Sequence, residues 1–454
     1  MTQTTHPQKL TKARRDGLTF FVLGAAVFLL LGIALGHAGS ETSNSMLDLK
    51  GVYYPAKCLL AHCDPYNQQD VEGIYLQSVG DAGAHSKTHL QVATLGVNLP
   101  TTFMLATPLA MMPWGLACVV WMTLIAGGFI IAAWLMWSLA KDRSPLMAGA
   151  LLGILLANGA LLLALGNTAG VVVSFCAIAV WCFIEDRFVV AGVLCLAVSL
   201  AVKPHDGGLV WLYFLLAGGV YRRRALQTLA ATVAICLAAV AWVSYVGPHW
   251  PDEVRSNLAT VSAPSGINDP GPSATRAARD ANMVINLQAA ISIFQNNPRF
   301  YNSVSYLICG SLFLVWLIAT IKAQQSAAMA WLALAAIVPI TLLGTYHRPH
   351  DAGLLMLTIP ACGLLWSRGG SVGWIALLIN FIGFLLVGTI PLAILIAFAD
   401  KLHLDSSGLV EKVLTVILVR PLSLVLFAMS IFYLWIYVAT VRDQVPAEQT
   451  LQTL

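Results

Sequence analysis

The chain has 454 residues, of which 58% are hydrophobic and only 10% are charged, and its mean hydropathy is +0.78. These values exclude a soluble globular protein and predict an all-α polytopic membrane protein that forms a single domain over residues 1–454. The net charge of +4 is small, so we expect no nucleic-acid partner. No Walker-type or dinucleotide-binding glycine loop is present in a strand-turn-helix context, so ATP-driven transport has no support within the chain.

Apolar runs close to the length that crosses a bilayer recur along the whole chain. We expect about 12 transmembrane helices, at residues 18–37, 114–139, 145–165, 168–184, 188–202, 206–221, 225–246, 303–321, 327–345, 351–367, 371–399 and 414–440. No small-residue cleavage site closely follows the first run, so we expect it to remain as a membrane anchor.

The basic residues of the short loops predict the orientation of the chain, because such loops stay in the cytoplasm. With a cytoplasmic N-terminus, the loops with Lys141, Arg187, Arg222, Lys322 and Arg368 and the tail 441–454 are all cytoplasmic. This orientation requires residues 97–113, which contain three prolines, to be re-entrant, interfacial or part of a broken helix. Two long external loops follow, at 38–96 and 247–302.

The first external loop contains the segment Met46–Tyr66, in which apolar side chains recur at helical spacing. We expect an interfacial helix that lies on the membrane, with Asp48 near its start and Asp64-Pro65 at its end. Asp48 fits two roles equally, as a cap of this helix or as a catalytic carboxylate. Asp64 fits a turn with Pro65 and Tyr66 better than it fits catalysis.

Nine cysteines are distributed over the chain, and seven of them lie in apolar runs, where a cysteine is usually a small buried hydrophobe. Cys58 and Cys63 both belong to the first external loop. Close spacing alone is weak evidence for a disulfide, so both the bridged and the reduced forms stay open.

Most of the other chemically capable residues fall in short external turns of this topology: Asn167, Lys203, His205, Asp206, His347, Arg348, His350 and Asp351. Lys203 and His205 fit a solvated helix end as well as a site. The 347–351 cluster predicts a site, because a turn between two apolar runs needs neither imidazoles, a guanidinium nor a carboxylate. No third ligand stands at a recognised spacing from His347 and His350, so we predict no transition-metal site, whereas a divalent ion bound by carboxylates and a substrate phosphate stays open.

The second external loop is rich in Pro, Ser, Asn and Asp between residues 262 and 273, a composition that predicts an irregular excursion over the surface. Apolar residues between 277 and 294 have the spacing of a short helix that packs back over the site. Such a lid would exclude water from a transfer reaction.

Six short motifs follow one another between residues 46 and 360: Asp48 with Tyr53-Tyr54-x-Ala56, Cys63-Asp64-Pro-Tyr66, Leu99-Pro100 with Pro108 and Pro113, Leu165-Gly-Asn167-Thr-Ala-Gly170, Lys203-Pro204, and His350-Asp351. In this order they resemble the motifs of glycosyltransferase family 87, polyprenol-phosphate-sugar-dependent enzymes of the GT-C fold that include bacterial mannosyltransferases. The chain departs from the family where Asn167 replaces a glutamine and where Pro100 replaces paired prolines.

The resemblance implies an enzyme of the plasma (inner) membrane that transfers a hexose, with mannose as the expected sugar, from a polyprenyl-phosphate donor to a lipid or glycan acceptor on the extracytoplasmic face. It implies that Asp48 is the general base, taking the proton of an acceptor hydroxyl that attacks the anomeric carbon with inversion. We expect substrate contacts from Asp64, Tyr66, Asn167, Lys203, His205, His347, Arg348, His350 and Asp351, and we expect no cofactor.

Other functions stay open. The alternative from another class is a transporter or flippase of lipid-linked sugars, which an intramembrane polar pathway or an inverted repeat would support. A polymer ligase of the GT-C type is the second enzyme alternative.

Overall fold

The computed structural model describes residues 7–36, 45–79, 87–264, 266–272, 284–402, 404 and 408–444. Within these residues the chain is helical and contains no strand. Parts of both expected external loops, and residues 445–454 of the expected cytoplasmic tail, lie outside the described residues.

Seven helices of the described chain are long and apolar enough to cross a membrane: α1 (Pro7–Gly36), α6 (Trp114–Ala140), α7 (Pro145–Asn158) continued by α8 (Ala160–Leu165), α12 (Gly219–Val246), α16 (Pro298–Lys322), α17 (Ala327–Gly344) and α22 (Pro421–Gln444). An eighth span results if α19 (Gly370–Leu386) and α20 (Thr389–Lys401), which are bent by 80°, form one broken span. The protein is therefore an all-α, multi-pass membrane protein, as the composition predicts.

The other expected spans are shorter helices. The helices α9 (Ala169–Ile184), α10 (Val189–Val202) and α11 (Pro204–Ala217) have 16, 14 and 14 residues. At 1.5 Å per residue they extend over about 21–24 Å, less than the roughly 30 Å of a hydrocarbon core. Residues 351–367 form most of a buried 3-10 helix, η3 (Pro349–Thr358), and of α18 (Ile359–Arg368).

The proline-rich stretch 97–113 forms α5 (Pro100–Ala110), which has 11 residues. A helix of this length cannot cross the bilayer, so the stretch is not a full span, as its three prolines predict.

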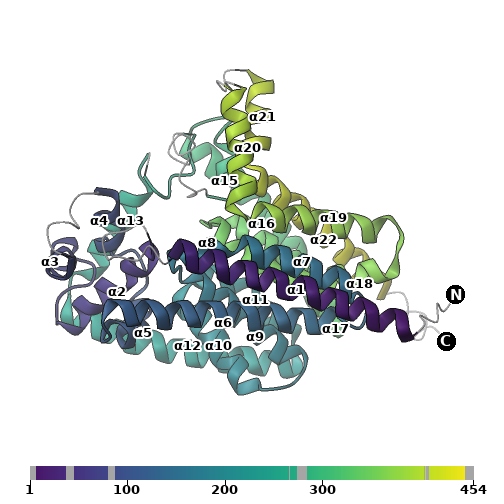
Figure 1. Cartoon of the computed structure of the whole chain (residues 1–454), viewed down its shortest axis with the longest axis horizontal. Helices are drawn as coiled ribbons and strands as arrows, with labels where there is room; N and C mark the ends of the chain where they lie inside the picture. The colour runs from purple at the N-terminus through teal and green to yellow at the C-terminus, as the bar shows by residue number, and fades with distance from the viewer. Residues whose placement is uncertain are drawn as a thin grey trace.

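The two ends of the helix bundle differ in character (Figure 1). The helix α1 begins and α22 ends at one end, whereas α2 (Leu47–Leu60), α3 (Gln68–Val79), α4 (Lys87–Thr94) and α13 (Trp250–Ser262) gather at the opposite end. At the end where α1 begins, Arg14 pairs with Asp142 just after α6, at 2.7 Å. Both long loops that the sequence predicts to be external thus contribute helices to the end remote from the chain termini. Figure 1 also shows α20 and α21 (Leu409–Val419) projecting from the bundle.

The helix α2 forms where the sequence predicts it, but its surroundings and its end differ from the prediction. Its residues from Leu49 to Ala56 are all buried, and it packs against α4 and α5, so its apolar side chains contact protein instead of a membrane surface. It ends at Leu60 because His62 adopts a left-handed conformation with φ of 59°. The N–H groups of Cys63 and His62 then donate to the carbonyls of Cys58 and Leu59, closing a Schellman motif.

A disulfide joins Cys58 in the last turn of α2 to Cys63. The structure thus contains the bridge that spacing alone left open. It fixes the direction in which the chain leaves α2.

The second external loop packs back onto the bundle through residues 284–293. Only α15 (Leu287–Ile291) of the expected helix falls within the described residues, since 273–283 lie outside them. The N–H of Ile285 donates to the carbonyl of His347 at 2.9 Å, and Ser423 Oγ donates to the carbonyls of Ile285 and Asn286. These bonds tie the loop to α22 and to the segment that precedes η3.

Candidate functional site

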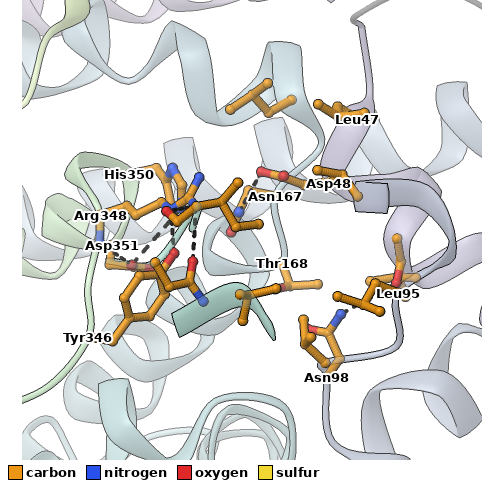
Figure 2. Close-up of a pocket in the computed structure, with 18 of the residues that line it drawn as sticks. Leu47, Asp48, Leu95, Asn98, Asn167, Thr168, Tyr346, Arg348, His350 and Asp351 are labelled. Atoms are coloured by element: carbon orange, nitrogen blue, oxygen red, sulfur yellow. Dashed lines mark hydrogen bonds and ion pairs between the residues drawn. The ribbon is translucent and has the colours of Figure 1, made fainter. Parts of the chain in front are cut away.

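A cavity of about 340 Å³ lies between the α2 end of the bundle and the segment after α17. Figure 2 shows side chains from α2, from the turn before α9 and from residues 346–351 around it. Its polar lining includes Asp48, Asn98, Asn167, Thr168, Lys203, Asn268, Tyr346, Arg348, His350 and Asp351. The volume is in the range of small-molecule sites.

Asp48 lies in the first turn of α2 and lines this cavity. The N-cap of α2 is Met46, which has no side-chain cap hydrogen bond. The Asp48 carboxylate instead accepts a hydrogen bond of 2.7 Å at Oδ2 from Asn167 Nδ2. The geometry therefore favours a role in the cavity over the capping role.

The turn between α8 and α9 determines where Asn167 lies. Gly166 has φ of 65°, and an added Cβ would come within 2.7 Å of Met46 Sδ, so both the backbone and the space require glycine. Asn167 Oδ1 accepts a hydrogen bond of 2.8 Å from the N–H of Ala169. Because this bond identifies the amide oxygen, the amide nitrogen is the atom that faces Asp48.

Lys203 lies at the break between α10 and α11, which Pro204 enforces because a residue before proline avoids the helical conformation. Its Nζ donates to Asp351 Oδ1 at 2.7 Å, and Asp351 Oδ2 accepts from the N–H of Arg348 at 2.8 Å. Burial by itself raises the pKa of Asp351, but the Lys203 ammonium outweighs burial and lowers it. Asp351 is therefore ionised at neutral pH, and it holds the Lys203 side chain and the backbone of Arg348 in place.

Arg348 joins the second external loop to the cavity wall. Its guanidinium donates to the carbonyl of Ile267 at 3.1 Å, to Asn268 Oδ1 at 3.2 Å and to the hydroxyl of Tyr346. The neighbouring imidazole of His350 is almost completely buried, and burial lowers its pKa. His350 is consequently neutral at neutral pH and can donate one hydrogen bond and accept another.

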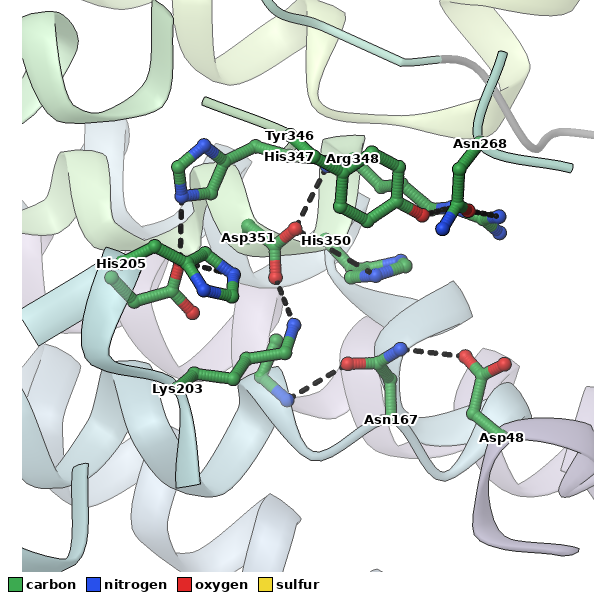
Figure 3. Close-up of polar contacts among 12 residues, drawn as sticks. Asp48, Asn167, Lys203, His205, Asn268, Tyr346, His347, Arg348, His350 and Asp351 are labelled. Atoms are coloured by element: carbon green, nitrogen blue, oxygen red, sulfur yellow. Dashed lines mark hydrogen bonds and ion pairs between the residues drawn. The ribbon is translucent and has the colours of Figure 1, made fainter. Parts of the chain in front are cut away.

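The cavity thus presents a carboxylate on one side and two cationic side chains with a neutral imidazole on the other (Figure 3). Asp48 Oδ1 makes no hydrogen bond to any described residue, so it remains available to a ligand. A carboxylate oxygen of this kind accepts a proton, and guanidinium and ammonium groups bind phosphate.

Four of the expected contact residues lie outside the cavity lining. Asp64 Oδ1 accepts from the N–H of Tyr66 at 2.9 Å, which closes a turn at the chain reversal after α2. The Tyr66 hydroxyl donates to the carbonyl of Asn98 at 2.7 Å, and its side chain is buried among apolar neighbours. Both residues have a structural role here, because the reversal directs them away from Asp48.

His205 and His347 lie beyond the Lys203–Asp351 pair, next to Asp206 (Figure 3). His347 Nε2 is 2.8 Å from Asp206 Oδ1, and both side chains are completely buried. Burial lowers the pKa of His347, but the Asp206 carboxylate outweighs burial and raises it. His205, in the first turn of α11, and His347, in the segment between α17 and η3, both face Asp206 and do not line the cavity.

Sequence reasoning missed several lining residues. Tyr346 directly precedes the predicted cluster, and Asn268 belongs to the polar stretch of the second external loop, so their positions in the sequence are the only signals for them. Asn98 and Thr168 have no signal of their own. The sequence places His205, Asp206 and His347 on the same face as the other candidates, but it does not predict that they form a separate cluster, because the cluster joins two segments that are far apart in the chain.

Comparison of the chain with models of known protein families finds no match, and comparisons with characterised proteins and with solved structures find none either. A functional assignment therefore depends on the chemistry of the cavity and on the motif resemblance.

Proposed function

We propose that this protein is a glycosyltransferase of the GT-C type that transfers a hexose, with mannose as the expected sugar, from a polyprenyl-phosphate donor. The acceptor is a lipid or glycan, and the reaction occurs on the extracytoplasmic face of the plasma (inner) membrane. Twelve spans are part of this proposal, with the short helices α9, α10 and α11 counted among them.

The observation that carries the proposal is the opposition of Asp48 to Arg348 and His350 across one cavity. A sugar hydroxyl is a poor nucleophile, so a carboxylate within hydrogen-bond reach accelerates its attack by removing its proton. The departing polyprenyl phosphate gains negative charge, which fixed cations stabilise. A single displacement of this kind inverts the anomeric centre.

The proposed roles follow the cavity lining. Asp48 is the general base, and Asn167 orients its carboxylate. Arg348, Lys203 and His350 contact the donor phosphate or the acceptor, and Asp351 holds Lys203 and Arg348 in position. Asp64, Tyr66, His205 and His347 are not included among the proposed substrate contacts, since they do not line the cavity.

The test supplies radiolabelled polyprenyl-phosphate-mannose or GDP-mannose to purified protein in lipid nanodiscs, with a membrane lipid extract as the source of acceptor. We expect labelled product from the polyprenyl donor only, and a loss of about 10²–10⁴-fold in Asp48→Asn, which keeps the size of the side chain but removes its basicity. The matched control is Asp64→Asn, which changes an aspartate outside the cavity and should retain most of the activity.

Three results would contradict the proposal. Transfer from GDP-mannose alone would refute the donor class, and equal turnover in Asp48→Asn and wild type would refute the general base. Movement of the lipid-linked sugar across liposomes, without any transfer, would favour a flippase.

A further inference from the structure

A second cluster of polar side chains lies behind the cavity wall and takes no part in the proposed transfer. It consists of His205 and Asp206 in the first turn of α11 and His347 in the segment after α17. Their ligand-type atoms all lie within 4.8 Å of one another. Asp206 and His347 are completely buried, whereas the side chain of His205 is 35% exposed.

The hydrogen bonds of His347 identify which of its ring nitrogens has a lone pair. Its Nδ1 lies 3.2 Å from the carbonyl oxygen of Thr345, which accepts hydrogen bonds only, and 3.4 Å from the hydroxyl of the same residue, so the shorter contact assigns the donor role to Nδ1. In the neutral ring, Nε2 then presents a lone pair to Asp206 Oδ1 at 2.8 Å. Two acceptor atoms this close together require a positive charge between or upon them.

The carboxylate of Asp206 also lacks hydrogen-bond donors within the described part of the chain. Neither of its carboxylate oxygens makes a hydrogen bond to any described residue, and nor does His347 Nε2. A buried carboxylate without such partners is costly unless a cation compensates it. Protonation of His347 would supply one charge, but it would leave Asp206 Oδ2 and the nearby His205 without a role.

We propose that His205, Asp206 and His347 bind a divalent transition-metal ion of the Zn²⁺ type. Two imidazoles and a carboxylate are ligands that zinc prefers, and at Zn–N distances of about 2.0–2.1 Å, tetrahedral ligand atoms lie about 3.3 Å apart. The contacts of Asp206 Oδ1 with His347 and His205, at 2.8 and 3.9 Å, lie on either side of this value. The hydrogen bond from His347 Nδ1 to a backbone carbonyl is the support that metal-bound histidines commonly have.

His205 also lines a separate, largely apolar cavity of about 390 Å³ between α11, α16 and α17. This cavity reaches His205, so a water molecule from it can complete a four-coordinate ion. The bound metal would join the start of α11 to the segment before η3. Lys203 and Arg348 flank its ligands in sequence and line the first cavity, so the metal would also position the cations there.

The test measures metal directly and does not depend on glycosyl transfer. Protein is purified through an affinity tag without histidines, dialysed against metal-free buffer, and analysed for zinc by mass spectrometry. Co²⁺, added to the metal-depleted protein, reports a tetrahedral site through its visible absorption. The variants are His205→Ala and His347→Ala, and the control is His249→Ala, which changes an exposed histidine before α13.

We expect about one zinc per chain in wild type and in His249→Ala, and at least a tenfold lower content in both cluster variants. Added Zn²⁺ should raise the unfolding temperature of wild type but not that of His205→Ala. His205→Ala is the better variant for this measurement, because the His205 side chain is partly exposed and its removal disturbs the fold less than removal of the buried His347. If wild type contains no zinc and shows no cobalt absorption, the proposal is overturned. His347 and Asp206 would then be an ion pair of an imidazolium and a carboxylate. Equal zinc content in wild type and both cluster variants would overturn it as well.

Discussion

Asn167 donates a hydrogen bond of 2.7 Å to the carboxylate of Asp48, although the two residues are 119 positions apart in the chain. The same amide accepts from the N–H of Ala169 through its oxygen, so its orientation is fixed before any substrate binds. The bond occupies only Oδ2 of Asp48, and the other oxygen stays available in the cavity. Asn167 is thus a positioning residue for the proposed base.

Asn167→Asp tests this relationship. The substituted carboxylate still accepts from Ala169 N–H but places an acceptor and a negative charge against Asp48, where the amide placed a donor. We expect a decrease of about tenfold or more in the rate constant for transfer, and an acidic limb of the pH–rate profile at higher pH, because adjacent like charges disfavour ionisation. Steady-state kinetics over a range of pH checks both effects. A reduced rate with an unmoved pH profile would indicate a purely structural role.

Gly166→Ala tests how the turn before Asn167 is held. Alanine in the left-handed conformation costs about 1–2 kcal/mol, and its Cβ would also collide with Met46 and α2. We expect a lower unfolding temperature in detergent together with reduced transfer. Gly310→Ala is the matched control, because an added Cβ at Gly310 in α16 meets no atom within 4 Å. Equal destabilisation by the two substitutions would show that the turn is not strained by a side chain.

The sequence predicts much of the helical architecture, because long apolar runs indicate helices that enter the bilayer and basic short loops indicate its cytoplasmic side. It also predicts the start of α2, since the apolar spacing after Asp48 is a local pattern. It does not predict the end of α2, which depends on the left-handed conformation of His62, because histidine is enriched in that conformation but still adopts it in only a small minority of cases. Nor does it predict that the helix is buried, because burial depends on α4 and α5, which follow later in the chain.

The candidate site likewise contains residues whose position the sequence predicts and residues whose position it does not. Asp48, Arg348 and His350 stand out because their residue types are unexpected between apolar runs, and they do line one cavity. His205 and His347 stand out for the same reason but face Asp206, since the direction of a side chain at a helix start depends on packing that a short motif does not encode. The Asp48–Asn167 hydrogen bond likewise depends on how α2 packs against the turn after α8.

The disulfide between Cys58 and Cys63 gives a countable prediction. Nine cysteines are present, so protein denatured without reductant should take up seven thiol-reactive polyethylene glycol tags, and reduced protein should take up nine. Replacing both residues by alanine should lower the free energy of unfolding by about 2 kcal/mol, as expected for a short closed loop. Nine tags without reductant would contradict the bridge and, with it, an oxidising environment for this loop.

The orientation of the bundle gives the last prediction. Ser256 in α13 and Gln324 in the link from α16 to α17 are both exposed, and the sequence assigns them to opposite sides of the membrane. Single cysteines at these positions, in a variant without the native cysteines, should react differently with a membrane-impermeant maleimide. In intact cells or spheroplasts we expect labelling of Ser256→Cys only, and in inside-out vesicles labelling of Gln324→Cys only. The basic loops are the physical reason, because lysine and arginine in short loops are retained in the cytoplasm. Labelling of Ser256→Cys from the cytoplasmic side alone would reverse the topology. It would also place the cavity with Asp48 in the cytoplasm, where the proposed extracytoplasmic transfer could not occur.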